Sequence, residues 1–140
     1  MRILAVDYGD ARTGFAVSDL LNTMAGEAWV LPERHAEKVA EHIVSEAKKR
    51  DVGTIVLGYP KNMDGTLGPR AEKSEALSEL VRAMCDIPVV MWDERRTTVD
   101  AHRILTDVGK HGKKRKDTVD AVAASLILEG YLNSLHTKTR

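Results

Sequence analysis

Three acidic positions of this sequence lie where an ionised side chain is costly, and they could do chemistry. Asp7 ends one run of apolar residues, and Asp93 or Glu94 ends another. Asp120 falls about 20° from Ile127 around a helix, at the border of its apolar stripe. Burying a carboxylate costs several kcal/mol unless a cation or hydrogen bonds compensate it. Together these acids predict a cation site.

The residue types indicate which cation. Carboxylate oxygens without histidine or cysteine ligands suit Mg²⁺ or Mn²⁺. Two such ions about 3.5–4 Å apart are a known device for phosphodiester cleavage, in which one activates water and the other stabilises the leaving 3′ oxygen. The ligands would be Asp7, Asp120 and either Asp93 or Glu94. Alternation along a strand sends these last two to opposite faces, so the residues alone leave that choice open.

The elements that must position these acids indicate an α/β fold. The sequence predicts a mixed five-stranded sheet, with its first three strands antiparallel, flanked by helices. The strands are expected at 3–6, 13–18, 28–31, 54–57 and 89–92, and the helices at 36–50, 69–84, 97–108 and from 117 onward. The carboxyl ends of parallel strands converge on one crevice. The first and fifth strands would therefore bring their acids together, and the last helix would add Asp120.

A tight turn is predicted directly after the first acid. Gly9 and Gly14 bracket it, where a reversal of the chain or a ligand lying against the backbone excludes a Cβ atom. The same pattern also occurs in purely structural hairpins.

Basic residues are expected to hold the phosphates. Lys and Arg number 21, as do Asp and Glu, so only the placement of charge is informative. Five of the seven residues 110–116 are basic, and we expect a flexible segment that grips the nucleic-acid backbone just before a helix capped by Asp117. A solvated linker is the alternative. The predicted substrate-binding residues are Arg12, Lys61, Arg95, Lys113, Lys114, Arg115 and Lys116.

Length and composition set broader limits. A chain of 140 residues fits a single domain, 1–140, with a self-sufficient core. Cys85 is the sole cysteine, which excludes an intramolecular disulfide and a thiolate metal cage. The sequence has no apolar run long enough to span a membrane and no secretory signal pattern, so we expect a cytoplasmic protein without a membrane partner.

Four groups of motifs occur along the chain in a specific order and spacing. They are Asp7-Tyr8-Gly9 with Arg12-Thr13-Gly14 and Ser18-Asp19, Gly58-Tyr59-Pro60 with Asn62-Met63-Asp64-Gly65, Asp93-Glu94-Arg95 with Thr97-Thr98, and Asp117 to Leu132. Together they resemble the YqgF/RuvX family of RNase H-like nucleases, and the resemblance spans the whole chain. Related junction resolvases carry an acid at the end of the fourth strand, whereas here that strand ends in Gly58-Tyr59-Pro60.

The resemblance implies an RNase H-like fold and a metal-dependent nuclease. It gives the catalytic and metal-binding roles to Asp7, Glu94 and Asp120. The implied function is processing of the 5′ end of pre-16S rRNA in ribosome biogenesis, with Holliday junction resolution as the alternative. The implied partner is structured RNA or branched DNA, and we expect a monomer or a weak homodimer.

Two further alternatives come from other classes of protein. A non-catalytic RNA-binding module would keep the fold and the basic segment without cleaving its ligand. Kinase-like ATPases share the turn after Asp7, but 140 residues leave no room for their second domain. Metal-dependent cleavage distinguishes the nuclease from the binding module, and ATP turnover would indicate the ATPase.

Overall fold

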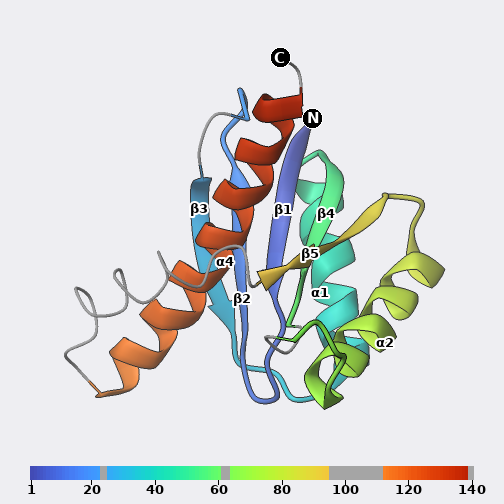
Figure 1. Ribbon diagram of the computed structural model, residues 1–140, viewed down its shortest axis with the longest axis vertical. Helices are drawn as coiled ribbons and strands as arrows, with labels where there is room; N and C mark the ends of the chain where they lie inside the picture. Colours follow the sequence, from blue (N-terminus) through green and yellow to red (C-terminus); the bar gives the residue numbers. More distant parts are fainter. Residues whose placement is uncertain (23–24, 61–63, 95–111, 139–140) are drawn as a thin grey trace.

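A computed structural model describes residues 1–22, 25–60, 64–94 and 112–138, with only the backbone described for residues 112–120 and 136–138. In this part of the chain, five strands form one sheet with helices on both faces (Figure 1). The strands are β1 (Arg2–Asp7), β2 (Thr13–Ser18), β3 (Ala25–Leu31), β4 (Val52–Tyr59) and β5 (Val89–Asp93). The helices are α1 (Ala36–Lys49), α2 (Pro69–Met84) and α4 (Gly112–Lys138). None of these helices is long and apolar enough to cross a membrane.

The strand order is β3-β2-β1-β4-β5. β1 pairs antiparallel with β2, which pairs antiparallel with β3, while β1, β4 and β5 run parallel to one another. This is the predicted mixed sheet. The carboxyl ends of the three parallel strands lie along one edge, where ligands bind in open α/β sheets.

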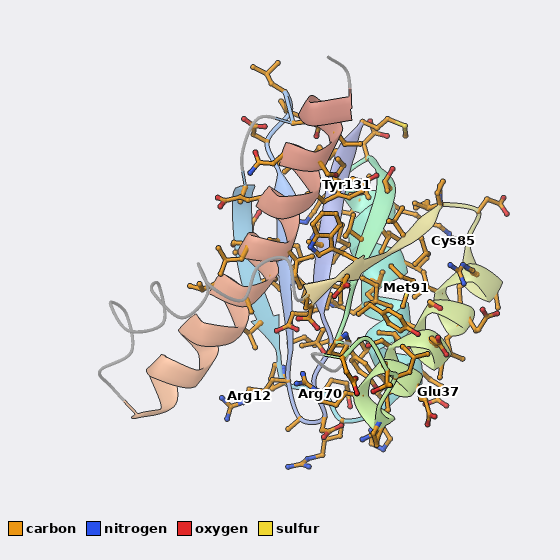
Figure 2. The ribbon with its side chains drawn as sticks, in the orientation of Figure 1. Arg12, Glu37, Arg70, Cys85, Met91 and Tyr131 are labelled. Carbon is orange, nitrogen blue, oxygen red and sulfur yellow. The ribbon has the colours of Figure 1, made fainter. Side chains whose placement is uncertain are left out.

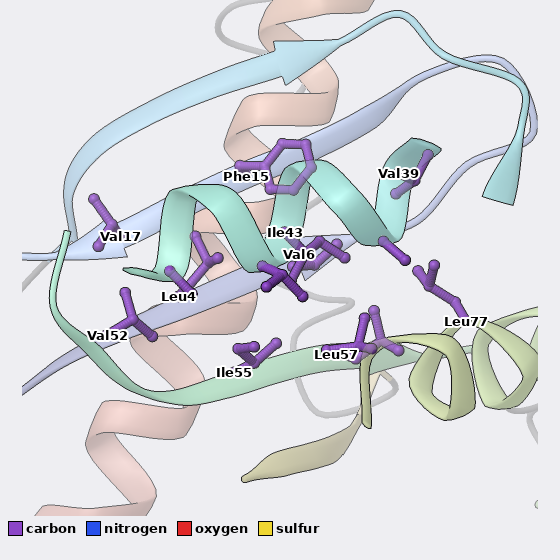
Figure 3. Close-up of a cluster of buried hydrophobic side chains, with 14 residues drawn as sticks. Leu4, Val6, Phe15, Val17, Val39, Ile43, Val52, Ile55, Leu57 and Leu77 are labelled. Carbon is purple, nitrogen blue, oxygen red and sulfur yellow. The ribbon is translucent and has the colours of Figure 1, made fainter. Parts of the chain in front are cut away.

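Each face of the sheet has its own apolar cluster because side chains alternate along a strand. On one face, Leu4 and Val6 of β1 pack with Val39 and Ile43 of α1 (Figure 3). On the other face, Ile3 and Ala5 belong to a cluster that also contains Ala124, Ile127 and Leu128 of α4. The α4 face of the sheet is therefore identified by the odd-numbered residues of β1.

Two of the predicted helices form as expected. α1 buries the stripe Val39, Ala40, Ile43, Val44 and Ala47. α2 has the predicted bounds, with Pro69 in its first turn, where the missing N–H of proline leaves no helical hydrogen bond unmade.

The structure places the starts of β3 and α4 several residues before the predicted ones. β3 begins at Ala25 rather than near residue 28, because its pairing with β2 extends to Ser18 opposite Ala25. α4 begins at Gly112, so the prediction of a flexible segment over 110–116 is wrong for residues 112–116, and Asp117 lies inside the helix instead of capping it. Lysine and arginine are good helix formers and extend the last helix toward its start. The helix predicted at 97–108 lies outside the described residues.

Candidate active site

Asp7 and Glu94, which come from two non-adjacent strands, meet at the carboxyl edge of the sheet. Asp7 is the last residue of β1, and Glu94 follows directly after β5. Although β4 lies between these strands, the two carboxyl groups are joined by a hydrogen bond. Such a bond requires a proton on one of the two groups. The predicted convergence of these acids is thus present in the structure.

Gly58 of β4 makes the meeting possible. It is buried between the two acidic strands, and a Cβ atom built on it would lie 3.1 Å from Cδ of Glu94 and 2.8 Å from Cδ1 of Ile127. A side chain here would crowd the carboxyl group of Glu94, which would have to shift by a few tenths of an ångström. The acid that meets Asp7 therefore comes from the end of β5 and lies against Gly58, the residue before the last of β4.

The environment of Glu94 favours its protonated form. Burial raises the pKa of the Glu94 carboxyl, and the nearby charge of Asp93 raises it further. The guanidinium of Arg70 and the hydrogen bond with Asp7 act in the opposite direction on this pKa. A partly buried carboxyl pair of this kind is stable when a proton, or a cation, lies between the two groups.

The two adjacent acids at the end of β5 belong to opposite faces of the sheet. Val89 and Met91 pack against the α1 cluster, whereas Val90 and Trp92 pack against the α4 cluster. Continuing this alternation places Asp93 on the α1 face and Glu94 on the α4 face. Because Asp7 follows Ile3 and Ala5 on the α4 face, the geometry pairs it with Glu94.

Residue 120 belongs to α4, two turns before Ile127. Ala124, Ile127 and Leu128 all pack against the sheet, and position 120 precedes them by 4, 7 and 8 residues. These spacings place residue 120 on the same stripe of the helix. The side chain of Asp120 lies outside the described part of the chain, so its role as a third ligand stays a prediction.

The described donors at this edge fit a hard divalent cation. Asp7 and Glu94 offer only carboxylate oxygens, the ligands that Mg²⁺ and Mn²⁺ prefer. Among the described side chains, no group of three possible ligands stands together, so a complete metal site needs a donor from beyond them. Position 120 on α4 is the predicted source of that donor.

Two cations on α2, which were not predicted from the sequence, lie beside the β1–β2 turn that follows Asp7. Arg70 is exposed, and its charge acts directly on the carboxyl group of Glu94. Lys73 is one turn further along, and its Nζ lies 2.7 Å from Oδ1 of Asp10 in the β1–β2 turn. The Lys73–Asp10 ion pair links the first turns of α2 to the end of β1. The sequence shows a basic residue in the first turn of this helix, where it opposes the helix dipole, but not where the helix packs.

Of the predicted phosphate-binding residues, only Arg12 has a side chain in the described part of the chain. Arg12 lies at the end of the β1–β2 turn, where Gly9 is required because a Cβ atom there would lie 2.3 Å from the carbonyl oxygen of Arg12. Lys113, Lys114, Arg115 and Lys116 lie in the first turns of α4, with side chains that are not described. Lys61 and Arg95 lie outside the described residues. Figure 2 shows Arg12 and Arg70 along the same lower edge of the molecule.

The chain is similar in sequence to several named proteins. It is 47% identical over 133 residues to a protein of Halothermothrix orenii named "Putative pre-16S rRNA nuclease", with 95% of each chain covered. It is 43% identical over 140 residues to a protein of the same name from Halalkalibacterium halodurans, covering 99% of this chain and 100% of the relative.

Solved structures show the same fold at low sequence identity. Thermus thermophilus RuvC in complex with Holliday junction substrate superposes with a TM-score of 0.65 and 10% identity, covering 96% of both chains. The Fowlpox virus resolvase in complex with Holliday junction DNA gives a TM-score of 0.54 at 10% identity, covering 99% of this chain and 98% of the resolvase. These likenesses confirm the predicted RNase H-like fold.

The family comparison covers nearly all of the sequence. The model described as "RuvX: Holliday junction resolvase" matches residues 1–134, which include β1, β5 and most of α4. This protein therefore belongs to the RuvX family, also called YqgF, which its motifs resemble.

Proposed function

We propose that this protein is a metal-dependent nuclease that hydrolyses phosphodiester bonds, and that its substrate is the 5′ end of pre-16S rRNA. The observation that carries the proposal is the hydrogen-bonded pair of Asp7 and Glu94, which come together at the carboxyl edge of the sheet. The substrate is suggested by the relatives, which share 40–47% identity with this chain and the name "Putative pre-16S rRNA nuclease".

Asp7, Glu94 and Asp120 would hold one or two Mg²⁺ or Mn²⁺ ions. When bound, the metal supplies an activated water and stabilises charge on the leaving 3′ oxygen. Metal binding requires both carboxyl groups to be ionised, and burial raises the pKa of Glu94, so the metal affinity should rise with pH. Gly58 keeps the space in which the Glu94 carboxylate reaches across β4.

Arg70 would offset the charge of these acids as the substrate approaches. It lies in the first turn of α2, is exposed, and among the described residues forms no ion pair, whereas the neighbouring Lys73 is engaged with Asp10. Acids alone would repel a phosphate, and a guanidinium binds phosphate oxygens with well-directed hydrogen bonds. We assign to Arg70 the binding of substrate phosphate close to the cleaved bond.

Holliday junction resolution is a second candidate function. The description of the matching family model and the likeness to Thermus thermophilus RuvC favour it. A resolvase that cuts two strands symmetrically needs two active sites, so it should act as a dimer. A nuclease that trims RNA can act as a monomer.

The test combines two substrates with three variants. Purified protein should cleave RNA that spans the mature 16S 5′ end, in Mg²⁺ or Mn²⁺ and not in EDTA, and it should leave a four-way DNA junction intact. Asp7→Asn should abolish cleavage while the protein remains folded, and Glu94→Gln should lose several orders of magnitude in rate. Asp93→Asn, the matched control, should lose much less because Asp93 belongs to the other face.

Each outcome separates the candidates. Cleavage of the junction by a dimer, without cleavage of the RNA, would assign the resolvase function instead. Undiminished cleavage by purified Asp7→Asn would refute a metal site at the Asp7–Glu94 pair. A larger loss for Asp93→Asn than for Glu94→Gln would move the ligand to Asp93. Tight RNA binding without cleavage under any metal would indicate a binding module.

A further inference from the structure

A hollow lined partly by basic residues lies at the same end of the sheet as Asp7 and Glu94, but apart from these acids. It is a cavity of about 400 Å³ between the β1–β2 turn and the segment that connects β3 to α1. Its volume is in the range of small-ligand sites in proteins. We name it the hairpin cavity, and its lining residues are Ala11, Arg12, Pro32, Glu33, Arg34 and His35.

The register of the sheet fixes the place of the hairpin cavity relative to Asp7. Asp7 is opposite Gly14 of β2, and Gly14 is opposite Val30 of β3. Arg12 and Pro32 each stand two residues beyond this row, so the alternation of the strands assigns both to the α4 face, as it does Asp7. Strand spacing and rise put their Cα atoms on the order of 8–12 Å from Asp7.

That separation matches a short run of nucleic-acid backbone. Successive phosphates of one strand in a duplex are about 3.4 Å apart along the helix axis. Because the backbone also winds around this axis, phosphates are farther apart in space than the axial rise, so a strand whose cleaved bond lies at Asp7 would reach the hairpin cavity within about four nucleotides. Because the β1–β2 turn lies between the two places, a single backbone can contact both.

The charges of the hairpin cavity favour an anion. Arg12 and Arg34 contribute two guanidinium groups, and Glu33 contributes one carboxylate. That carboxylate is already engaged, because its Oε2 accepts hydrogen bonds from the backbone N–H groups of Arg34 (2.9 Å) and His35 (3.1 Å) and lies 3.1 Å from Nδ1 of His35. These hydrogen bonds hold the pKa of Glu33 below its ordinary value.

The first turn of α1 adds to this preference. His35 is the N-cap of this 14-residue helix, and a helix N-terminus carries a partial positive charge. Arg34 is exposed, and no ion pair engages it within the described part of the chain. Its guanidinium is thus available to a ligand, and the hairpin cavity combines a hollow with a net positive charge and a fixed loop.

We propose that the hairpin cavity binds a backbone phosphate of the substrate strand, within about four nucleotides of the cleaved bond, with Arg34 and Arg12 as its cationic contacts. This inference rests on the proposed nuclease function and deepens it. It gives the substrate a direction, since the strand must run from the Asp7–Glu94 pair past the β1–β2 turn toward the start of α1. Cleavage should then need more substrate on one side of the cut than on the other.

The test measures binding separately from cleavage. Wild-type protein in EDTA is titrated with fluorescent RNA oligonucleotides extended by one to eight nucleotides on either side of the cleavage site, at several salt concentrations. Arg34→Gln should weaken binding about two- to fivefold and reduce the salt slope by up to roughly 0.7–0.9, only for oligonucleotides extended beyond about four nucleotides on one side. Glu33→Gln should tighten binding of the same oligonucleotides.

Lys48→Gln is the matched control, because Lys48 is an exposed cation in the last turn of the same helix, about 20 Å from its N-terminus. It should change neither affinity nor salt slope. Equal weakening by Lys48→Gln and Arg34→Gln, or an Arg34→Gln effect independent of oligonucleotide length, would overturn the proposal. Failure of the nuclease function would appear as absent cleavage in Mg²⁺ and Mn²⁺, which leaves this binding comparison intact.

Discussion

Replacing Gly58 with alanine should test how the carboxyl pair is built. The new Cβ would lie 2.8 Å from Cδ1 of Ile127 and 3.1 Å from Cδ of Glu94, so both side chains must move. Ile127 is 1% exposed and packs in the α4 cluster, which leaves it little space. We expect the Glu94 carboxyl to be pushed away from Asp7.

The stability change of Gly58→Ala is the sum of opposing effects. Overpacking a buried site costs about 1–3 kcal/mol. Alanine in a strand is favoured over glycine by roughly 0.5–1 kcal/mol, and no positive φ angle at Gly58 opposes it. The net loss should be about 0–2.5 kcal/mol, which lowers Tm by about 3–5 °C per kcal/mol in a chain of this size.

Gly58→Ala should reduce the cleavage activity more strongly than it reduces the stability of the fold. Groups that orient metal ligands typically change metal affinity or activity about 10–100-fold when altered, and we expect a loss of that size in Mn²⁺-dependent cleavage by Gly58→Ala. The assay is cleavage of the RNA substrate over a Mn²⁺ titration, together with thermal unfolding in EDTA. Higher Mn²⁺ should recover part of the lost rate.

A second substitution separates the two collisions. Ile127→Val removes Cδ1 and costs about 0.5–1.5 kcal/mol alone, but in the Gly58→Ala background it should relieve part of the overpacking. Thermal stability of the double variant should rise relative to Gly58→Ala, while cleavage stays low because the collision with Glu94 persists. Wild-type cleavage by Gly58→Ala, or recovery of cleavage in the double variant, would refute this account of the site.

Three further predictions address the surrounding charges. Arg70→Ala should weaken substrate binding or slow cleavage, and Arg70→Lys should retain part of the activity that Arg70→Ala loses. The control variant Lys48→Ala should have no effect in the same kinetic assay. If Arg70→Ala and Lys48→Ala had equal effects, Arg70 would not belong to the site. Replacing residues 113–116 together by alanine should keep α4 helical by circular dichroism, since alanine is the best helix former. The same variant should flatten the slope of log affinity against log salt concentration by up to roughly 0.7–0.9 for each phosphate that it no longer neutralises. An unchanged slope would mean that these residues form a solvated face that does not contact the substrate. Trp29 Nε1 donates a hydrogen bond to Nε2 of His42, and burial lowers the pKa of His42. The unfolded chain therefore takes up a proton at this histidine at a higher pH than the folded chain does. The free energy of unfolding should be at its full value above pH 6.5 and should fall as the pH decreases. Urea unfolding between pH 5 and 7.5 should show this decline, which His42→Gln should reduce.

The order and type of the described elements could be predicted well from the sequence. Apolar runs bounded by polar residues locate β1, β4 and β5, and the helical spacing of residues 39–47 locates α1. The predicted β3 is too short because Gly26 and Glu27 are poor strand residues, and its pairing with β2 overrides their local preference. The start of α4 escapes prediction because the charge of the basic segment suggests disorder, although lysine and arginine favour helix.

The candidate site could be predicted in part. The acids at the ends of β1 and β5 follow from the rule that carboxyl ends of parallel strands meet. The choice between Asp93 and Glu94 does not follow from the residues, because β5 packs against apolar clusters on both faces, so its sequence shows no polar side. Arg70 escapes prediction because its approach to Glu94 depends on how α2 docks, which no local pattern encodes.

The α4 face has a consequence for synthesis of the protein. Its apolar cluster joins Ile3 and Ala5 to Ile127 and Leu128, so the ribosome produces one half of this layer long before the other. Until α4 emerges, the nascent chain exposes the apolar α4 face of β1, which invites association with chaperones or other chains. Packing α4 onto the sheet also requires contacts between residues far apart in sequence, and such contacts form slowly. Because Asp7 and Glu94 lie under the same layer, the acidic edge should become ordered only late, after translation has passed α4.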